Sequence, residues 1–339
     1  MFRRFLAAVI IVAVATGLLV AVWPQLFGLA MAPVLAQVVS LRGLAIAIAL
    51  VFVVALTLAA LLSPSVRRFA ASLAVALLVF CAVSVAVLST RGFGNPSFES
   101  ATDNDVTVLS WNTLGDAPGA EVIALLALDT GAEIVALPET TNETGLEVAQ
   151  IMAAAGQPMW VHTVPYDQIS KSRSTTLLIS VELGEYDVNL DERTTATLPS
   201  GVATPQNGTG PTIIAVHAVA PIPGEMQNWR SDLRWLKDAC AGGNVIMAGD
   251  FNSTIDHYSG LATAEGAAIG ACADAGLASD NAAVGTWPTS LPTLIGSPID
   301  HVMATLNWRV SGMRVIESHD GYGSDHRPVL VQLTPAGGD

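Results

Sequence analysis

The first 90 residues contain no aspartate or glutamate, and three long apolar segments dominate this part of the chain. The segments run roughly over residues 5–23, 43–62 and 69–88. Each approaches the ~20 helical residues that a bilayer crossing requires. The charged side chains of this part are all arginines, namely Arg3, Arg4, Arg42, Arg67 and Arg68. We therefore interpret residues 1–90 as a membrane anchor with three transmembrane helices.

A cleaved signal peptide is the alternative interpretation of the first segment, because two arginines precede an apolar stretch there. The stretch is longer than the ~7–15 apolar residues that are usual in a signal core, and two further segments follow it. A retained helix is therefore the better interpretation.

The arginines also predict an orientation, because short cytoplasmic loops are enriched in basic residues. Arg3 and Arg4 precede the first segment, and Arg67 and Arg68 lie between the second and the third. With both pairs in the cytoplasm, the chain crosses the membrane three times and its C-terminal part lies outside. We expect a multi-pass protein of the cell membrane with an extracytoplasmic domain.

The second part of the chain is strongly acidic. All 29 acidic residues lie from Glu99 onward, against nine lysines and arginines after Gly92, which is a formal charge of −20. Residues 91–104 begin with a stretch rich in Gly, Pro, Ser and Asn and are predicted to be a linker. Residues 105–335 then form one soluble domain. Duplex nucleic acid is not an expected partner, because its binding depends mostly on lysines and arginines that contact phosphates.

Two small clusters of basic residues could still form a local nucleic-acid-binding patch. One consists of Lys171 and Arg173, and the other of Arg230, Arg234 and Lys237. The second group has helical spacing and is also typical of a solvated helix face.

The soluble domain alternates short apolar runs with amphipathic helical patterns. Strands are predicted at residues 106–111, 134–137, 175–180, 212–216, 245–248, 299–304, 308–315 and 328–333. Helices are predicted at residues 120–130, 144–155 and 229–239. This mixture indicates an α/β domain with more than one sheet.

Polar or ionisable residues directly follow several of these apolar runs. The pieces are VLSWNT, IVALPET, IIAVHAVAP, VIMAGDFNS and SPIDHV, followed by GSDHRPV. Because α/β domains usually assemble ligand sites at strand ends, we expect these side chains to gather at one site.

In this order the motifs resemble the endonuclease/exonuclease/phosphatase family, which includes deoxyribonuclease I-like nucleases, sphingomyelinases and inositol phosphatases. The resemblance covers residues 105–333, and GDFN followed about 75 residues later by SDH is its most specific part. It implies an α/β fold, a four-layer α-β-β-α sandwich of two mixed sheets, preceded here by the three transmembrane helices.

The resemblance assigns metal ligands to three positions. Asn112 and Glu139 match the family's ligands, and Asp325 matches a position that holds a second metal in some relatives. The implied cofactor is Mg²⁺, with Mn²⁺ as a substitute, since hard cations prefer oxygen ligands. The structural alternatives are a turn residue at Asn112 and a helix N-terminal acid at Glu139.

The remaining motif residues match the family's catalytic groups. Asp250 and Asn252 match the pair that contacts the scissile phosphate and a nearby water, and Asp300 matches the aspartate that orients the catalytic histidine, His326. His217 matches the histidine that donates to the phosphate. A carboxylate-held imidazole can accept a proton from water or stabilise phosphoryl charge near neutral pH. An ordinary turn at GDFN and a structural histidine at position 217 are the alternatives.

The other four histidines carry weaker expectations. His257 follows GDFN and could reach a substrate phosphate, His301 could pack beside the site, and His162 and His319 belong to no motif. Trp287 in TWP is expected either in the wall of the pocket or in the core.

The implied function is Mg²⁺-dependent hydrolysis of a phosphate ester or pyrophosphate. The architecture also resembles a membrane-bound bacterial branch of the family that is linked to lipid-carrier phosphates and glycopeptide-type antibiotic resistance. A phosphorylated small molecule or lipid-linked intermediate of the cell envelope, next to the bilayer, is the favoured substrate. The alternatives are an extracytoplasmic nuclease and a non-catalytic membrane-binding protein on a degenerate fold.

The chain has three cysteines, of which Cys240 and Cys272 lie in the soluble domain. They could form one disulfide across the GDFN segment in an oxidising compartment, or stay as two buried thiols.

Overall fold

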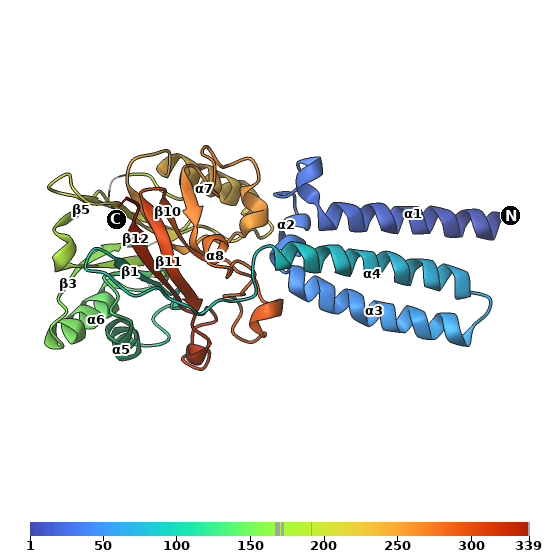
Figure 1. Cartoon of the computed structure of the whole chain (residues 1–339), viewed down its shortest axis with the longest axis horizontal. Coiled ribbons are helices and arrows are strands. Elements are labelled where there is room, and N and C mark those ends of the chain that lie inside the picture. Colours follow the sequence, from blue (N-terminus) through green and yellow to red (C-terminus); the bar gives the residue numbers. More distant parts are fainter. Residues whose placement is uncertain (167–169, 171–172, 191, 338–339) are drawn as a thin grey trace.

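The computed structural model describes residues 1–166, 170, 173–190 and 192–337. Within them, a bundle of three long helices extends from one side of an α/β sandwich (Figure 1). The abrupt change in composition along the chain thus coincides with a change of architecture.

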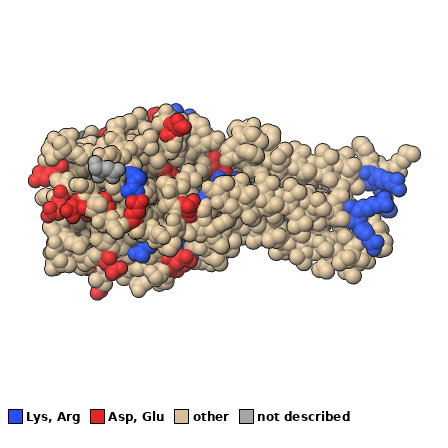
Figure 2. All heavy atoms as spheres, viewed as in Figure 1, with Lys and Arg blue, Asp and Glu red and all other residues tan. Residues whose placement is uncertain are grey.

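Three helices lie at the predicted transmembrane segments, namely α1 (Phe2–Val22), α3 (Arg42–Leu62) and α4 (Arg67–Ser89). All three are long and apolar enough to cross a membrane. The N-terminus and the α3–α4 connection lie at the end of the bundle that is remote from the sandwich (Figure 1). Basic side chains gather at this same end (Figure 2).

The connection between α1 and α3 forms two short elements, η1 (Pro24–Phe27) and α2 (Leu35–Ser40). They lie where the bundle meets the sandwich (Figure 1). Ala36 of α2 is fully buried in one apolar cluster with Trp229 and Met247 of the sandwich. The helical bundle and the sandwich therefore share a packed interface.

The sandwich contains two six-stranded sheets. The first has the strand order β11-β12-β1-β2-β4-β3, and the second the order β5-β6-β7-β8-β10-β9. The strands of the first are β1 (Val106–Ser110), β2 (Ile134–Leu137), β3 (Met159–Val164), β4 (Thr175–Ser180), β11 (Trp308–Val315) and β12 (Val329–Pro335). Those of the second are β5 (Tyr186–Val188), β6 (Gly201–Pro205), β7 (Thr212–His217), β8 (Val245–Asp250), β9 (Cys272–Asp274) and β10 (Asp300–Thr305). Both sheets are mixed, because β1–β2 and β7–β8 are parallel pairs and the other pairs are antiparallel.

Successive side chains of a strand point to opposite faces of its sheet, and this alternation accounts for the layers of the sandwich. Val108 of β1 is buried between the two sheets, whereas its neighbour Leu109 is buried under the helices α5 (Ala120–Thr130) and α6 (Asn142–Ala154). Helix α7 (Met226–Ala239) covers the outer face of the second sheet. Each fully buried aliphatic side chain contributes roughly 1.5–3 kcal/mol to this packing. The predicted four-layer sandwich of two mixed sheets is confirmed.

Short helical turns connect the layers. They are η3 (Val181–Leu183), η4 (Ile255–Tyr258), α8 (Ala275–Ala278), η5 (Thr293–Ile295) and η6 (Glu317–His319).

The sequence pattern does not predict the strands β3, β5, β6 and β9. Of these, β3, β5 and β9 lie at sheet edges, and β5 and β9 have only three residues each. Short edge strands are bonded on one side alone and carry few apolar residues, so their periodicity is weak.

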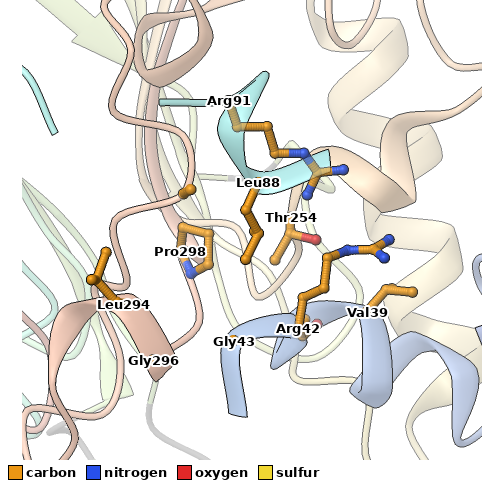
Figure 3. Close-up of a pocket in the computed structure, with 11 residues that line it drawn as sticks. Val39, Arg42, Gly43, Leu88, Arg91, Thr254, Leu294, Gly296 and Pro298 are labelled. Carbon is orange, nitrogen blue, oxygen red and sulfur yellow. The ribbon is translucent and has the colours of Figure 1, made fainter. Parts of the chain in front are cut away.

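A buried charge cluster joins the bundle to the sandwich. The carboxylate of Asp256 in η4 accepts hydrogen bonds from Arg42 at the start of α3 (2.7 Å) and from both terminal nitrogens of Arg91 (2.8 Å each). Gln25 of η1 donates to the same carboxylate (2.7 Å). In Figure 3 the side chains of Arg42 and Arg91 extend in the same direction, with Thr254 between them. This cluster holds the helices at one place on the sandwich.

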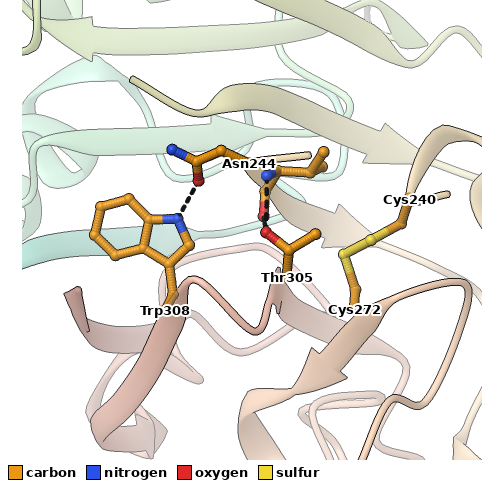
Figure 4. The surroundings of a disulfide bond; sticks show 6 residues. Cys240, Asn244, Cys272, Thr305 and Trp308 are labelled. Atoms are coloured by element: carbon orange, nitrogen blue, oxygen red, sulfur yellow. Dashed lines mark hydrogen bonds between the residues drawn. A yellow bond between two sulfur atoms is a disulfide. The ribbon is translucent and has the colours of Figure 1, made fainter. Parts of the chain in front are cut away.

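A disulfide joins Cys240 at the end of α7 to Cys272 at the start of β9 (Figure 4). The first of the two alternatives for these cysteines is therefore present. Nearby, the indole nitrogen of Trp308 donates to the side-chain oxygen of Asn244 (2.6 Å). Both contacts fasten the connection between α7 and β8 to neighbouring strands.

Candidate active site

Strand register brings three of the predicted residues together. Central strand β8 ends at Asp250, which lies beside His217 in the parallel β7–β8 pair and opposite Asp300 in the antiparallel β8–β10 pair. Asn112 and Glu139 follow the parallel strands β1 and β2 of the other sheet, and His326 precedes β12. Because the two sheets face each other, these strand ends meet at one edge of the sandwich.

The imidazole of His326 is held between carboxylates. Its Nδ1 lies 2.9 Å and 3.1 Å from the two carboxylate oxygens of Asp300, and its Nε2 lies 3.9 Å from Oδ2 of Asp250. Burial alone would lower the pKa of His326, but the negative charges of Asp300 and Asp250 outweigh it and raise the pKa to about 10. His326 is therefore an imidazolium, with Nε2–H directed away from Asp300.

Asn112 links the two sheets at the site. Its side-chain nitrogen donates to Asp250 (3.1 Å) and approaches Glu139 (3.4 Å), while its side-chain oxygen accepts from the backbone N–H of Leu114 (3.0 Å). Acting as an oxygen ligand would thus require the amide to turn. Burial raises the pKa of Glu139 and raises that of Asp250 to about 7.

Two site residues have left-handed backbone conformations. The φ angles of Glu139 and Asn252 are 56° and 45°. In Glu139 the strain is compensated because its carbonyl accepts hydrogen bonds from Gly115, Asp116 and the hydroxyl of Thr113. Non-glycine residues in this region cost about 1–3 kcal/mol and often occur at functional sites.

His217 is fully buried, and burial lowers its pKa to about 3, so it is neutral. The hydroxyl of Thr175 donates to the carbonyl of Pro199 (2.6 Å) and lies 3.1 Å from Nδ1 of His217. With that hydroxyl proton engaged, Nδ1 carries the ring proton and Nε2 is an acceptor. His217 can therefore donate to a phosphate only after it takes up a proton. Its Nε2 has no hydrogen-bond partner among the described residues and lies 3.9 Å from Glu139.

Asn252 and Asp325 complete the set. The side-chain nitrogen of Asn252 donates to Asp250 (3.0 Å) and to the carbonyl of Ala218 (2.9 Å). Asp325 accepts from the indole nitrogen of Trp287 (2.8 Å), and its other oxygen lies 3.9 Å from Nε2 of His326. Trp287 is thus a wall residue, the first of the two expectations for it.

A cavity of about 660 Å³ opens beside this group of residues. Its wall combines the polar groups Glu139, His217, Asp250, Asn252 and His326 with residues of α2 and of the loop after β7. Arg173 also lines the cavity and is a cation at its rim, whereas Lys171 lies outside the described residues. A pocket of this size can hold a small phosphorylated headgroup.

Comparison with known proteins agrees with the geometry. The profile of the Endonuclease/Exonuclease/phosphatase family matches residues 109–326, which is more than half of the chain. The chain belongs to this family. Comparison with curated protein sequences found no match.

Solved structures of the endonuclease/exonuclease/phosphatase fold are similar to the chain. An endonuclease/exonuclease/phosphatase from Beutenbergia cavernae has a TM-score of 0.52 and 18% identity, with 69% of this chain and 72% of that chain covered. A humanized TDP2 of D. rerio has a TM-score of 0.50 and 16% identity, with 68% of this chain and all of that chain (100%) covered. At these identities the likeness concerns the fold alone.

Members of the endonuclease/exonuclease/phosphatase family hydrolyse phosphate esters and depend on divalent metals, and the residues present fit such a metal. Ligand atoms of Asp250, Asp300 and His326 all lie within 4.8 Å of one another. Asp300 and His326 are hydrogen-bonded to each other, and within the described part of the chain the Asp250 carboxylate accepts only from neutral amide groups of Asn112 and Asn252. The carboxylates of Asp250 and Glu139 are therefore the oxygens best placed to bind a cation. The unpartnered atoms His217 Nε2 and Asp325 Oδ1 point to the same need for a ligand.

The remaining histidines are not in the cavity wall. Both ring nitrogens of His257 are engaged, with the backbone N–H of Thr254 (2.8 Å) and the carbonyl of Ala36 (3.2 Å). His257 therefore does not reach a phosphate, and instead fastens α2 to the sandwich. His301 is held by Asp274 (2.7 Å) behind the site, as a packing residue.

Sequence reasoning missed Arg327, the residue after His326. Its buried guanidinium donates to Asp320 (2.8 and 2.6 Å) and to the carbonyls of Gly285 (3.2 Å) and Leu291 (2.8 Å). These bonds hold the loop that carries Trp287. The arginine of the SDHRP motif was the available signal, since a charged side chain next to a buried strand needs partners.

Proposed function

We propose that this protein is a Mg²⁺-dependent phosphoesterase that cleaves a phosphate ester or pyrophosphate of a lipid or cell-envelope intermediate at the outer face of the membrane. The observation that carries the proposal is the cavity lined by Glu139, Asp250 and His326, with Asp300 hydrogen-bonded to His326 (2.9 Å). An array of carboxylates opposite an imidazolium suits a phosphoryl group, which needs cations around its oxygens and a proton for the leaving oxygen.

The cation would be held by Glu139 and Asp250, with Asn112 after rotation of its amide and with Asp325 at the rim. When bound, it would supply positive charge to the phosphoryl oxygens and lower the pKa of a coordinated water. The protein's own groups provide the rest. Nε2–H of His326 can donate to a phosphoryl or leaving oxygen, and Asp300 keeps that imidazole oriented and charged. The lone pair on Nε2 of His217 can accept a hydrogen bond from the attacking water and orient it.

The arginines support the proposed side of the membrane. The start of α1 and the α3–α4 connection, with Arg3, Arg4, Arg67 and Arg68, lie at the end of the bundle opposite the sandwich (Figures 1 and 2). Enrichment of basic residues on the cytoplasmic side would place the catalytic sandwich outside the cell. A disulfide in the sandwich suits an oxidising compartment.

The substrate class follows from charge and position. From Gly92 onward the chain carries nine basic and 29 acidic residues, which disfavours a polyanion such as duplex DNA. The catalytic cavity is lined partly by Gln37 and Leu41 of the membrane-proximal segment, so it opens next to the bilayer. Phosphorylated headgroups are concentrated there.

The test uses the full chain in lipid nanodiscs, with phosphate release measured from lipid phosphates, lipid pyrophosphates and oligonucleotides. We expect release that requires Mg²⁺, stops with EDTA and falls by at least ~100-fold in Glu139→Ala and in His326→Ala. Glu143→Ala, at an exposed acid of α6, is the matched control and should retain wild-type turnover. Rates in Glu139→Ala and His326→Ala close to wild type would refute the site, and cleavage of oligonucleotides alone would replace the substrate with nucleic acid.

A further inference from the structure

A second hollow lies directly beside the catalytic cavity. We call it the α2–α3 groove. It has a volume of about 780 Å³ and is lined on one side by α2 and the start of α3, and on the other by the loop between β7 and α7. Its wall is almost entirely aliphatic and includes Val34, Val38, Leu44, Ile48, Ile222 and Met226. The polar side chain of Gln37 also lines it, and its amide nitrogen already donates to the carbonyl of Pro221.

The groove adjoins the catalytic cavity. Gln37, Leu41, Pro221 and Ile222 line both spaces. A molecule lying in the groove would therefore pass these four residues and enter the space that holds the two histidines and the acidic cluster.

The other end of the groove lies on a membrane helix. Leu44, Ala45 and Ile48 belong to the first two turns of α3, so the groove extends about 6 Å along that helix. The same helix is long and apolar enough to cross the bilayer. The groove thus runs from the hydrocarbon edge of the membrane to the phosphate site.

Large apolar side chains are exposed along the groove. Val34 is 70% exposed, Ile222 is 53% exposed and Ile48 is 50% exposed. A contiguous exposed apolar surface usually marks a binding site. Because one end meets lipid and the other meets the phosphoesterase site, the occupant that fits both ends is a hydrocarbon chain with a phosphorylated head.

We propose that the α2–α3 groove binds the hydrocarbon chain of the substrate, an amphiphilic phosphate or pyrophosphate ester whose head lies at His217 and His326. This inference rests on the proposed phosphoesterase function and adds a chain-binding subsite to it. Its quantitative consequence is a dependence on chain length. Each methylene group that leaves water for the groove should improve kcat/KM about fourfold until the groove is filled.

The experiment compares alkyl phosphates and alkyl pyrophosphates, from ethyl to octyl, with the full chain in nanodiscs. For the wild type we expect kcat/KM to rise by more than ~100-fold across the series. Val38→Trp, which fills the groove, should flatten the series while cleavage of the ethyl compound stays within about twofold. Val51→Trp is the matched control, because Val51 is 69% exposed on the same bundle and does not line the groove. This control should keep the full chain-length effect.

A binding measurement keeps the test independent of turnover and of the folding of Val38→Trp. An octyl phosphate with a diazirine at its chain end is photolysed with Glu139→Ala protein, and labelled peptides are identified by mass spectrometry. Labels on residues 34–48 or 221–226 support the groove. Labels spread evenly over α1, α3 and α4 overturn it.

The two proposals fail in different ways. If no alkyl ester is cleaved in a Glu139-dependent manner, the phosphoesterase function fails and the photolabel alone decides the groove. If ethyl and octyl esters are cleaved equally well and the label avoids the groove, the chain-binding subsite is refuted while the phosphoesterase function stands.

Discussion

Replacing Asp256 by alanine would remove the acceptor that joins the helical bundle to the sandwich. Its carboxylate receives four hydrogen bonds of 2.7–2.8 Å, one each from Gln25 and Arg42 and two from Arg91. The side chains of Asp256, Arg42 and Arg91 are 1%, 5% and 11% exposed. Alanine would leave two guanidinium groups buried without their counter-charge. Breaking a buried pair in this way costs about 3–5 kcal/mol.

The assay is urea unfolding of the full chain in nanodiscs, followed by the fluorescence of the sandwich tryptophans. We expect the free energy of unfolding of Asp256→Ala to fall by about 3–5 kcal/mol. The exposed Asp187→Ala on β5 is the matched control and should change it by less than ~0.5 kcal/mol. A triple variant, Arg42→Met with Arg91→Met and Asp256→Leu, should recover most of the loss, because the cost comes from unpaired charge.

Acid should abolish the contribution of the Asp256 carboxylate to the free energy of unfolding. Burial alone would raise the pKa of Asp256, but the hydrogen bonds and charges of Arg91 and Arg42 outweigh it and hold the pKa below its usual range. In the unfolded chain the pKa of this aspartate is ~3.9. Because its pKa is lower in the folded state, the carboxylate stabilises the protein fully at pH values above ~3.9, and this stabilisation is lost as the pH falls toward the folded-state pKa. The difference between wild type and Asp256→Ala should therefore shrink below about pH 4. A constant difference down to the acid transition, or a loss under ~1 kcal/mol at neutral pH, would refute this account.

Three further predictions concern the sandwich. Replacing both Cys240 and Cys272 by serine should lower the free energy of unfolding by about 3–4 kcal/mol, since the bridge closes a loop with a sequence separation of 32; an unchanged urea midpoint would contradict this. Arg327→Met should cost about 2–4 kcal/mol, because several acceptors in the Trp287 loop lose their donor, and a thermal melt within a degree of wild type would argue against that role. Trp229→Phe keeps most of the buried ring but removes the indole donor to the carbonyl of Asn252 (3.0 Å), so urea unfolding should show a loss of about 1–2 kcal/mol together with slower turnover. Full stability in Trp229→Phe would show that the hydrogen bond contributes nothing.

Local pattern was enough to predict most of the elements. Helices α1, α3 and α4 are marked by apolar length, and the central strands β1, β2, β8 and β10 by short buried runs that end in polar residues. The motif residues were also identifiable, because they stand at the ends of such runs, with Asp250 and His217 at the end of a strand, Asn112 just after one and Asp300 at the start of one. The sequence pattern did not predict the edge strands β3, β5 and β9. These strands bury too few apolar side chains to produce a clear period.

Only the tertiary structure shows which of the motif residues lie next to one another. Asp250 faces both His217 and Asp300 because β8 lies between β7 and β10, an order that no local propensity encodes. The same holds for the tautomer of His217, which depends on Thr175 in the other sheet.

The contact between the helical bundle and the sandwich shows most clearly what the tertiary structure alone contributes. The amino-acid sequence alone established that the first part of the chain is apolar and the second part is acidic. It also placed a set of phosphoesterase motifs in the acidic part. Arg42 and Asp256 lie 214 positions apart and look like ordinary charges in the sequence, yet they form the buried pair that docks α3 on the sandwich. The α2–α3 groove likewise combines residues 33–48 with residues 221–226. Local propensity acts over a few residues, whereas pairing of buried charges and apolar walls depends on which distant segments the packed chain brings together.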